Sequence, residues 1–294
     1  MPFQLEIFFD NLLNGLTLGA LYSLVTLGLV LTFSVIGIVN FAHGDLFMMG
    51  GYTFFLLNNS PLNLPYPVIA LLVIILTAVY SMIIERVAIH PIINRSWRTY
   101  AITTIGLSII LQNGALAIFS ADPKQTPTAL ANQIITPFGI RISLQRLLIL
   151  LVVVIVFIGL QVFVKHTKLG KTMRAVSQNR EMCQVVGINV YRIALITFGI
   201  GGANTGLAAA LITPLFSVYN TMGSMLTIKA LAAVVMGGMG QVNGALYASF
   251  LMGIVESFFG GYVAFAYKDV VSFGIFVLVL FLRPRGLFGK KIGL

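Results

Sequence analysis

Long apolar runs follow one another along the chain, separated by short polar stretches that often contain Gly or Pro. A helix needs about 20 apolar residues to cross roughly 30 Å of hydrocarbon, and most of these runs approach or exceed that length. They predict membrane segments over residues 9–36, 45–57, 67–89, 100–119, 143–164, 191–216, 222–235, 244–262 and 269–282. The pattern therefore predicts an all-α, polytopic membrane helical bundle of about eight to nine membrane segments.

Two of these segments, 45–57 and 222–235, are too short for an untilted crossing and have Gly at or beside their ends. Short or broken helices leave backbone groups free at membrane depth, and those groups need protein or water as partners. Helices of this kind usually line a cavity. We therefore expect both segments to border an internal space.

Composition narrows the class of protein further. The 294 residues are 58% hydrophobic and only 9% charged, with a mean hydropathy of +0.99, which excludes a soluble domain with a polar surface. We expect one transmembrane domain over residues 1–294. The first residues contain Glu6 and Asp10 but no basic residue, so they lack the positive region of a signal peptide and are expected to be retained. Cys183 is the only cysteine, which excludes an intramolecular disulfide.

A charged insert, residues 165–192, carries six of the 18 Lys and Arg. The positive-inside rule predicts that it is cytoplasmic and that the N-terminus is outside. Alternation of the segments then gives a cytoplasmic group of Arg86, Arg95, Arg98, Arg283, Arg285, Lys290 and Lys291, and an outer group of Lys124, Arg141, Arg146 and Lys268. This topology explains the net charge of +10 better than a nucleic-acid partner does.

The insert also contains Gly170-Lys171-Thr172, a fragment of a phosphate-binding loop. The full motif requires a Gly five positions earlier, where this chain has Lys165, and it requires a preceding strand. Zinc-protease, zinc-finger and nucleophile-elbow motifs do not occur in the sequence either. We therefore expect a protein that is not an enzyme and that binds no cofactor by itself.

One short helix is predicted inside the insert. Asn179 is a suitable N-cap, Glu181 lies in the first turn where the helix dipole favours an acid, and Gly187 is a suitable C-cap. Met182, Val185 and Val186 then form a small apolar face. So short a helix is marginal alone in water, so it must pack on the bilayer, on the chain itself or in a groove of a partner. A solvated interfacial loop would account for the charges equally well.

Polar residues within the apolar segments are candidates for a pathway or a gate. Asn40, His43 and Asp45 lie where a long segment meets a short one, and they could either fix the helix break or contact a substrate, with His43 as a gating element. Gln112, Asn113 and Asn204 need partners inside the bundle, and interhelical hydrogen bonds would satisfy them. Glu256 is the costliest of these groups, because it is an acid well inside a membrane helix, and it is a candidate for the pathway or for a subunit interface.

Six stretches of the chain resemble one family along its length. They are NGLTLGALYSLVTLGLVLTFSVIGIVNFAHGDLFMMGGY, IERVAIHPI, GLSIILQN, LGKTMRAVSQNREMCQVVGIN, KALAAVVMGGMGQVNGALYASFLMGIVES and YKDVVSFGIFVLVLFLRPRGLFG. In order and without large gaps, from residue 14 to 289, they look like the LivH-type permease of bacterial ATP-binding-cassette importers for branched-chain amino acids.

The resemblance implies partners and a location. A second homologous permease subunit would complete the translocation path, two cytoplasmic ATPase subunits would use ATP, and an extracytoplasmic substrate-binding protein would deliver the substrate to this chain in the bacterial inner membrane. The insert would be the coupling loop and would seat in a groove of an ATPase subunit. The residues that match the family pattern for this contact are Arg174, Asn179, Glu181, Gly187 and Ile188. Cys183 replaces the small residue that is common there. The expected mechanism is alternating access.

Three other functions are open at this point. An ion-coupled secondary carrier would transport without ATPases, although the capped insert helix and the lack of an acid-rich ion site argue against it. A non-transporting membrane scaffold would have all its mid-segment polar residues satisfied by one another. A related permease for urea or amides would share every motif above, because the substrate is implied by the resemblance alone.

Overall fold

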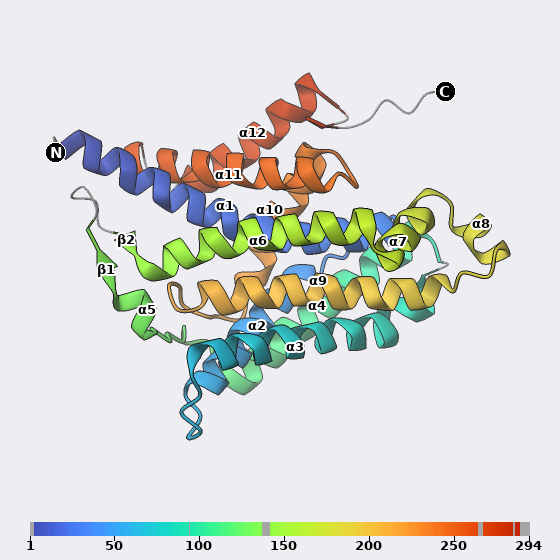
Figure 1. Ribbon diagram of the computed structural model, residues 1–294, viewed down its shortest axis with the longest axis horizontal. Helices are drawn as coiled ribbons and strands as arrows, with labels where there is room; N and C mark the ends of the chain where they lie inside the picture. The colour runs from blue at the N-terminus through green and yellow to red at the C-terminus, as the bar shows by residue number, and fades with distance from the viewer. Residues whose placement is uncertain (1–2, 94, 137–141, 264–266, 285, 289–294) are drawn as a thin grey trace.

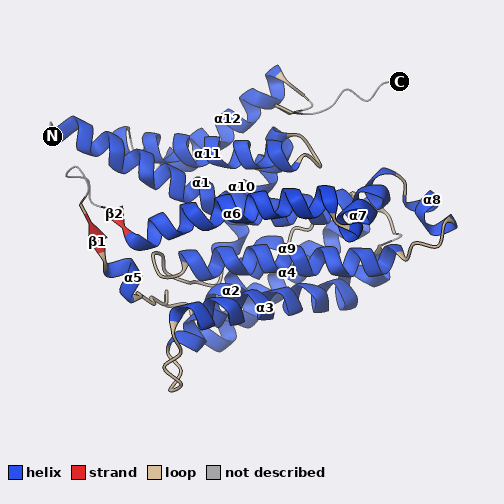
Figure 2. Cartoon of the chain, viewed as in Figure 1, coloured by secondary structure: helices blue, strands red, loops and turns tan. Residues whose placement is uncertain are grey.

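Apolar runs of the sequence form long helices that lie side by side, as Figures 1 and 2 show for the computed structural model. The structure describes residues 3–93, 95–136, 142–263, 267–284 and 286–288. The helices are α1 (Phe3–Ile36), α2 (His43–Asn58), α3 (Tyr66–Ile84), α4 (Trp97–Phe119), α5 (Ala129–Asn132), α6 (Leu144–His166), α7 (Lys168–Gln178), α8 (Arg180–Val185), α9 (Val190–Ile212), α10 (Met222–Gly237), α11 (Val242–Tyr262) and α12 (Lys268–Leu282). A π-turn, η1 (Glu85–Ile89), and a 3-10 turn, η2 (His90–Ile92), extend α3, and β1 (Ile134–Ile135) pairs antiparallel with β2 (Ile142–Ser143).

Within the described residues, six helices are long and apolar enough to cross a membrane: α1, α3 with its extension, α4, α6, α9 and α11. The all-α, polytopic architecture is therefore confirmed. The shorter α2, α10 and α12 have 16, 16 and 15 residues. A count of eight or nine membrane segments depends on how these three sit in the bilayer, so it stays a prediction, as does the single domain over 1–294.

The bundle has two distinct ends. In Figure 1, α1 begins at the left, beside β1, β2 and α5, whereas α7 and α8 lie at the right. We call these the loop end and the insert end. The turn that joins α3 to α4 lies at the insert end, because the ring of His90 is 4.9 Å from that of Tyr191 at the start of α9. Arg86 and Arg98 therefore share an end with the insert, as alternation of the segments requires, while Arg141, Arg285, Lys290 and Lys291 lie outside the described residues.

Helices α1 and α11 pack closely against each other, and α1 is the most buried of the six long helices. An added Cβ on Gly253 of α11 would lie 2.2 Å from the backbone nitrogen of Gly19 on α1, so only glycine permits this approach. By contrast, α4 and α6 lie at the periphery and expose apolar side chains such as Ile110 and Leu151. These outer faces suit contact with lipid.

The two half-length helices run in opposite directions from a shared crossing point. Gly44 of α2 donates its backbone N–H to Thr227 Oγ1 of α10 at 2.9 Å, and an added Cβ on Gly223 would lie 2.5 Å from Gly44 O. From this point α2 runs toward the loop end, where Phe54 meets Tyr66 at the start of α3. Helix α10 runs toward the insert end, where Gly237 contacts Gly244. The predicted short helices are therefore present, with their N-termini together inside the bundle.

The insert differs from the prediction of a single short helix. It forms two helices, because Lys168–Gln178 is also helical and buries Gly170, Met173 and Val176 against the bundle. Several predicted boundaries were also displaced by a few residues. Helix α9, for example, ends at Ile212 rather than at residue 216: Thr213 still has helical backbone, but Pro214 has no backbone N–H with which to continue the helical hydrogen bonds.

Candidate functional site

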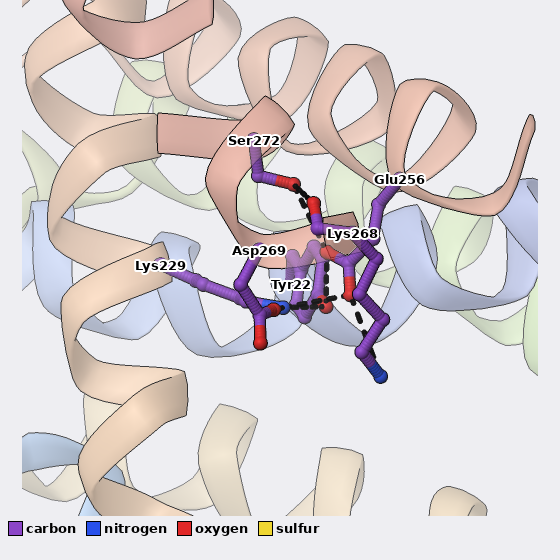
Figure 3. Close-up of polar contacts among 6 residues, drawn as sticks. All are labelled: Tyr22, Lys229, Glu256, Lys268, Asp269 and Ser272. Carbon is purple, nitrogen blue, oxygen red and sulfur yellow. Dashed lines mark hydrogen bonds and ion pairs between the residues drawn. The ribbon is translucent and has the colours of Figure 1, made fainter. Parts of the chain in front are cut away.

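Four charged side chains meet inside the bundle, carried by three helices that are distant in sequence (Figure 3). Lys229 Nζ of α10 lies 2.7 Å from Glu256 Oε1 of α11 and 2.6 Å from Asp269 Oδ1 of α12. The side chains of Lys229 and Glu256 are only 5% and 2% exposed. We name the whole group the charge cluster; its members are Tyr22, Lys229, Glu256, Lys268, Asp269 and Ser272.

Hydroxyl groups complete the cluster. Lys229 Nζ donates to Tyr22 Oη at 3.0 Å, and Tyr22 Oη donates to Glu256 Oε2 at 2.9 Å. Ser272 Oγ lies 3.3 Å from the same carboxylate oxygen, and Lys268 Nζ lies 4.0 Å from Glu256 Oε1. Two ammonium groups thus face two carboxylates, which keeps the cluster neutral at membrane depth. Buried charges in proteins persist only when they are paired in this way.

A cavity of about 540 Å³ opens beside the charge cluster. Lys229, Glu256, Lys268 and Asp269 form its polar wall. Its other walls are mostly apolar and include Leu21, Phe47, Ile212, Met222, Met225 and Leu226. A space of this size with one polar wall is typical of a small-molecule site. The expectation that the half-length helices border a space is met, since α10 contributes several wall residues and α2 contributes Phe47.

A second cavity, of about 390 Å³, lies next to the first and nearer the loop end. It is lined by Asn11, Asn14 and Arg146, among others. Glu256 and Lys268 border both cavities. The charge cluster therefore stands between two adjoining spaces, one of which reaches toward the loop end of the bundle.

The residues at the junction of α1 and α2 form a separate polar group, which we call the break cluster: Asn40, His43, Asp45 and Gln112. Asn40 Oδ1 accepts from the backbone nitrogen of Ala42 at 3.0 Å and so closes the turn before α2. His43 Nε2 lies 3.2 Å from Val25 O and 3.1 Å from Thr205 Oγ1, which ties α2 to α1 and α9.

Asp45 and Gln112 complete the break cluster. Asp45 lies in the first turn of α2, as predicted, and its Oδ1 accepts from Gln112 Nε2 of α4 at 3.0 Å. Gln112 Nε2 also lies 2.8 Å from Ser224 Oγ of α10. None of the four residues lines the cavities described above. Their contacts therefore fit the role of fixing the helix break better than direct contact with a substrate.

Asn113 and Asn204 were expected to form interhelical hydrogen bonds, and their surroundings differ from that expectation. Asn113 is exposed, and its Nδ2 donates to Ile109 O of its own helix at 2.8 Å, so the expectation that it bonds inside the bundle was wrong. Successive residues of a helix differ by about 100° in direction. The preceding residue, Gln112, therefore faces the bundle and reaches Asp45 of α2. Asn204 of α9 is buried, and its Nδ2 has no hydrogen-bond partner among the described residues.

At the insert end, α8 has the predicted cap and the predicted terminator. Asn179 Oδ1 accepts from Met182 N at 2.9 Å, and Gly187 has a positive φ of 82° that a side chain would strain. The backbone nitrogen of Ile188 then bonds Cys183 O at 2.9 Å, which closes the helix in a Schellman motif. The apolar face is uncovered, since Met182, Val185 and Val186 are 59%, 79% and 69% exposed.

Two arginines fasten the insert helices to the bundle. Arg174 Nη2 lies 3.3 Å from Lys165 O at the end of α6, and Arg180 Nε donates to Val35 O at the end of α1 at 2.8 Å. Partial burial lowers the pKa of the Arg180 guanidinium from its ordinary value, although the neighbouring Tyr100 opposes the shift. Glu181 is exposed on the first turn of α8. The insert therefore rests on the ends of α1 and α6 while its outer face stays open.

Sequence reasoning found Glu256 but missed the side chains around it. Lys229 carried a usable signal, because a lysine within an apolar half-length helix is as costly as the acid. Asp269 and Lys268 stood at the end of a predicted segment, where charged residues are ordinary, and Tyr22 and Ser272 carried no signal in one sequence. Among the described residues, no group of three or more His, Cys, Asp or Glu is placed to hold a metal ion.

Comparison with known proteins places the chain in a family. The model of the family described as branched-chain amino acid transport system / permease component matches residues 11–280. The chain is 35% identical over 297 residues to the high-affinity branched-chain amino acid transport system permease protein BraD of Pseudomonas aeruginosa, covering 96% of each chain. It is 32% identical over 302 residues to the permease protein LivH of the corresponding system of Escherichia coli, covering 99% of this chain and 98% of that one.

A more distant relative is the ribose import permease protein RbsC of Haemophilus influenzae, 23% identical over 291 residues, with 96% of this chain and 87% of that one covered. No solved structure gives a significant match. The family match extends from α1 into α12 and so includes both the charge cluster and α8. The relatives are permeases rather than enzymes. The chain therefore belongs to the family of permease components of branched-chain amino acid transport systems.

Proposed function

We propose that the chain is the membrane-spanning permease subunit of an ATP-binding-cassette importer that moves branched-chain or other hydrophobic amino acids across the bacterial inner membrane. Its family and its full-length likeness to BraD and LivH support this assignment. In this proposal a second homologous permease subunit completes the path, two cytoplasmic ATPase subunits consume the ATP, and an extracytoplasmic binding protein delivers the substrate. The chain itself binds no nucleotide.

The observation that carries the proposal is the uncovered apolar face of α8. Met182, Val185 and Val186 are the most exposed apolar side chains of a helix that is capped at both ends and fastened to α1 through Arg180. A short helix that is rigid, anchored and apolar on its outer side fits a groove in a partner. We assign α8 as the coupling helix. The apolar triplet enters a groove of an ATPase subunit, and the other residues assigned to this contact are Arg174, Asn179, Glu181, Gly187 and Ile188.

A pair of substitutions tests this contact. Met182→Asp combined with Val186→Asp should leave the folded chain intact, because both side chains are exposed, and should uncouple ATP hydrolysis from uptake, because the carboxylates would be desolvated in an apolar groove. Uptake and ATPase rates in proteoliposomes measure the effect. Lys171→Asp combined with Gln178→Asp is the control, because both residues are exposed on the neighbouring α7 and lie outside the triplet. Unchanged coupling in the first pair would refute the assignment of this face.

A cross-linking experiment identifies the partner. A photoreactive residue at Val185, the most exposed member of the triplet, should capture an ATPase subunit in inside-out vesicles. The matched control is the same residue at Leu62, which is 70% exposed in the connection between α2 and α3 at the opposite end. Capture of lipid alone at Val185 would count against the importer and in favour of a carrier that works without ATPases.

The cavity beside the charge cluster is the proposed part of the translocation path within this chain. An amino acid has charged groups that need polar partners and a side chain that needs an apolar surface, and this cavity offers both. Glu256 is thereby kept as a pathway residue, whereas the contacts of the break cluster suit a positioning role. The substrate is tested by competition, since leucine, isoleucine and valine should each block ATP-dependent uptake of labelled leucine. Block by urea or amides instead would indicate the alternative substrate class.

A further inference from the structure

The charge cluster contains two kinds of charged residue. Lys229 and Glu256 are almost completely buried and contact each other at 2.7 Å. Asp269 and Lys268 are 34% and 31% exposed, and both line the larger cavity. The first pair therefore holds the cluster together, whereas the second pair presents one carboxylate and one ammonium group to the space beside it.

Charge pairing within the cluster is uneven in a way that suits a ligand. Lys229 lies within 2.7 Å of two carboxylates, those of Glu256 and Asp269, so one ammonium group serves two acids at close range. Lys268 Nζ lies 4.0 Å from Glu256 Oε1 and supplies the second positive charge of the cluster. A cation that enters the cavity beside Asp269 would be attracted to its carboxylate. An anion beside Lys268 would be attracted to its ammonium group.

The walls around the cluster define the rest of the ligand. Phe47, Met222 and Leu226 form an apolar surface in the same cavity. Two opposite charges at one wall and an uncharged, apolar surface facing them match a molecule that has an ammonium and a carboxylate group at one end and an apolar body at the other. A monovalent ion would leave the apolar wall unused, and an apolar solute would make no use of the two charges.

We propose that the charge cluster binds the α-amino acid zwitterion as it passes through the permease. Asp269 binds the α-ammonium group, Lys268 binds the α-carboxylate, and the apolar wall receives the side chain. Lys229 and Glu256 also border the path, but they act as positioning residues: Lys229 holds Asp269 at the wall of the cavity, and Glu256, bonded to Tyr22 and Ser272, pairs with Lys229. The proposal rests on the proposed function, because it specifies where the transported amino acid binds within the path.

The position of the cluster between the two cavities fits this role. Glu256 and Lys268 border both spaces, and the smaller space lies toward the loop end, which is the predicted outer side. An amino acid that enters from the loop end reaches Lys268 before it reaches the apolar wall. Its carboxylate and ammonium groups therefore find partners before its side chain loses contact with water.

The test measures equilibrium binding of radiolabelled leucine to the complex of this chain with its copurified permease and ATPase partners, held in nanodiscs without the binding protein. Asp269→Asn and Lys268→Gln should each weaken leucine binding by at least about tenfold, because each removes one partner of a desolvated charge. Unlabelled 3-methylbutylamine, which lacks the carboxylate, and 4-methylpentanoate, which lacks the ammonium group, should compete poorly with leucine at the unaltered site. Asp10→Asn is the matched control, because Asp10 is an exposed acid of α1 that does not line either cavity.

The two variants separate binding from folding. Lys268→Gln leaves the close contacts of Lys229 with Glu256 and Asp269 in place, so it should assemble even if Asp269→Asn does not. In Lys268→Gln, 3-methylbutylamine should compete nearly as well as leucine, because the partner of the carboxylate is gone. A purely structural role of Lys268 would not change the preference of the site for ligands that carry a carboxylate. The proposal is overturned if both variants bind leucine like the unaltered complex, or if the unaltered complex takes up leucine with ATP but binds none at this site. Absence of ATP-dependent leucine uptake by the unaltered complex would instead refute the proposed function.

Discussion

The charge cluster and the break cluster are both polar groups in the middle of an apolar bundle, but only the charge cluster borders the larger cavity. In the charge cluster, ionised side chains from α10, α11 and α12 meet at a wall of a cavity of about 540 Å³. In the break cluster, the amide of Gln112, the imidazole of His43 and the carboxyl group of Asp45 connect α1, α2, α4, α9 and α10 without lining that space. Burial of a polar residue in a membrane protein thus separates into two cases, according to whether the residue also faces a space.

The two clusters also differ in the free energy that a substitution is expected to cost. Removal of one member of a buried ion pair leaves an uncompensated charge, whereas removal of one neutral hydrogen-bonding group leaves an unsatisfied dipole. The first loss is the larger one. The comparison therefore predicts that substitutions in the charge cluster disturb both stability and transport, and that substitutions in the break cluster disturb mainly stability.

The largest effect is expected for Lys229→Met. It leaves Glu256 and Asp269 without their shared cation and should destabilise the folded chain by about 3–5 kcal/mol, which thermal unfolding of the purified complex and the yield of folded chain would both report. The double variant Lys229→Met with Glu256→Gln should recover part of the loss, because it removes the buried carboxylate that Lys229 neutralised. Lys171→Met is the control, since Lys171 is exposed on α7. If Lys229→Met left the chain as stable as the unaltered protein, the ion pairs would contribute nothing to its stability.

A smaller effect is expected for Gln112→Leu in the break cluster. The change removes the amide that joins Asp45 of α2 to Ser224 of α10, and it should cost about 1–3 kcal/mol. Uptake per folded complex should be unchanged, because Gln112 does not line the cavities. Asn113→Leu is a close control, because that side chain is exposed and bonds only its own helix. If Gln112→Leu abolished uptake while the complex stayed equally stable, the break cluster would belong to the path.

The apolar periodicity of the sequence was sufficient for the architecture. Runs of sufficient length predicted α3, α4, α6 and α11 to within a few residues, and two short runs beside glycines predicted the half-length α2 and α10. The opposite directions of α2 and α10 could not be predicted, because they depend on the contact between Gly44 and Gly223, which are far apart in sequence. Helix α7 was missed because it buries only three small or apolar residues among many polar ones.

The candidate site was less accessible from sequence than the fold. The cost of an isolated acid identified Glu256, and the same physical rule applied to Lys229 would have suggested its partner. Asp269 is one of the first residues of α12, where an acid is commonly explained by the helix dipole, so its contact with Lys229 had no separate signal. For α8 the reverse held: the cap, the apolar triplet and the terminating glycine are all local features, and all three have the predicted geometry.

The smallest effect compares one hydroxyl from each cluster. Tyr22→Phe keeps the aromatic ring 5.2 Å from Lys229 Nζ but removes the oxygen that bonds both Lys229 and Glu256. Thr205→Val keeps the shape of Thr205 and removes an oxygen 3.1 Å from His43 Nε2, which still has Val25 O as a partner. Hydrogen bonds to charged groups stabilise by about 1.5–3 kcal/mol and neutral ones by about 0.5–1.5 kcal/mol, so Tyr22→Phe should be the more destabilising change by about 1 kcal/mol. Thermal unfolding of the two variants side by side measures the difference. Equal losses would mean that Tyr22 is bonded no more strongly than Thr205, and the distinction between the ion-paired charge cluster and the break cluster would then rest on the cavity alone.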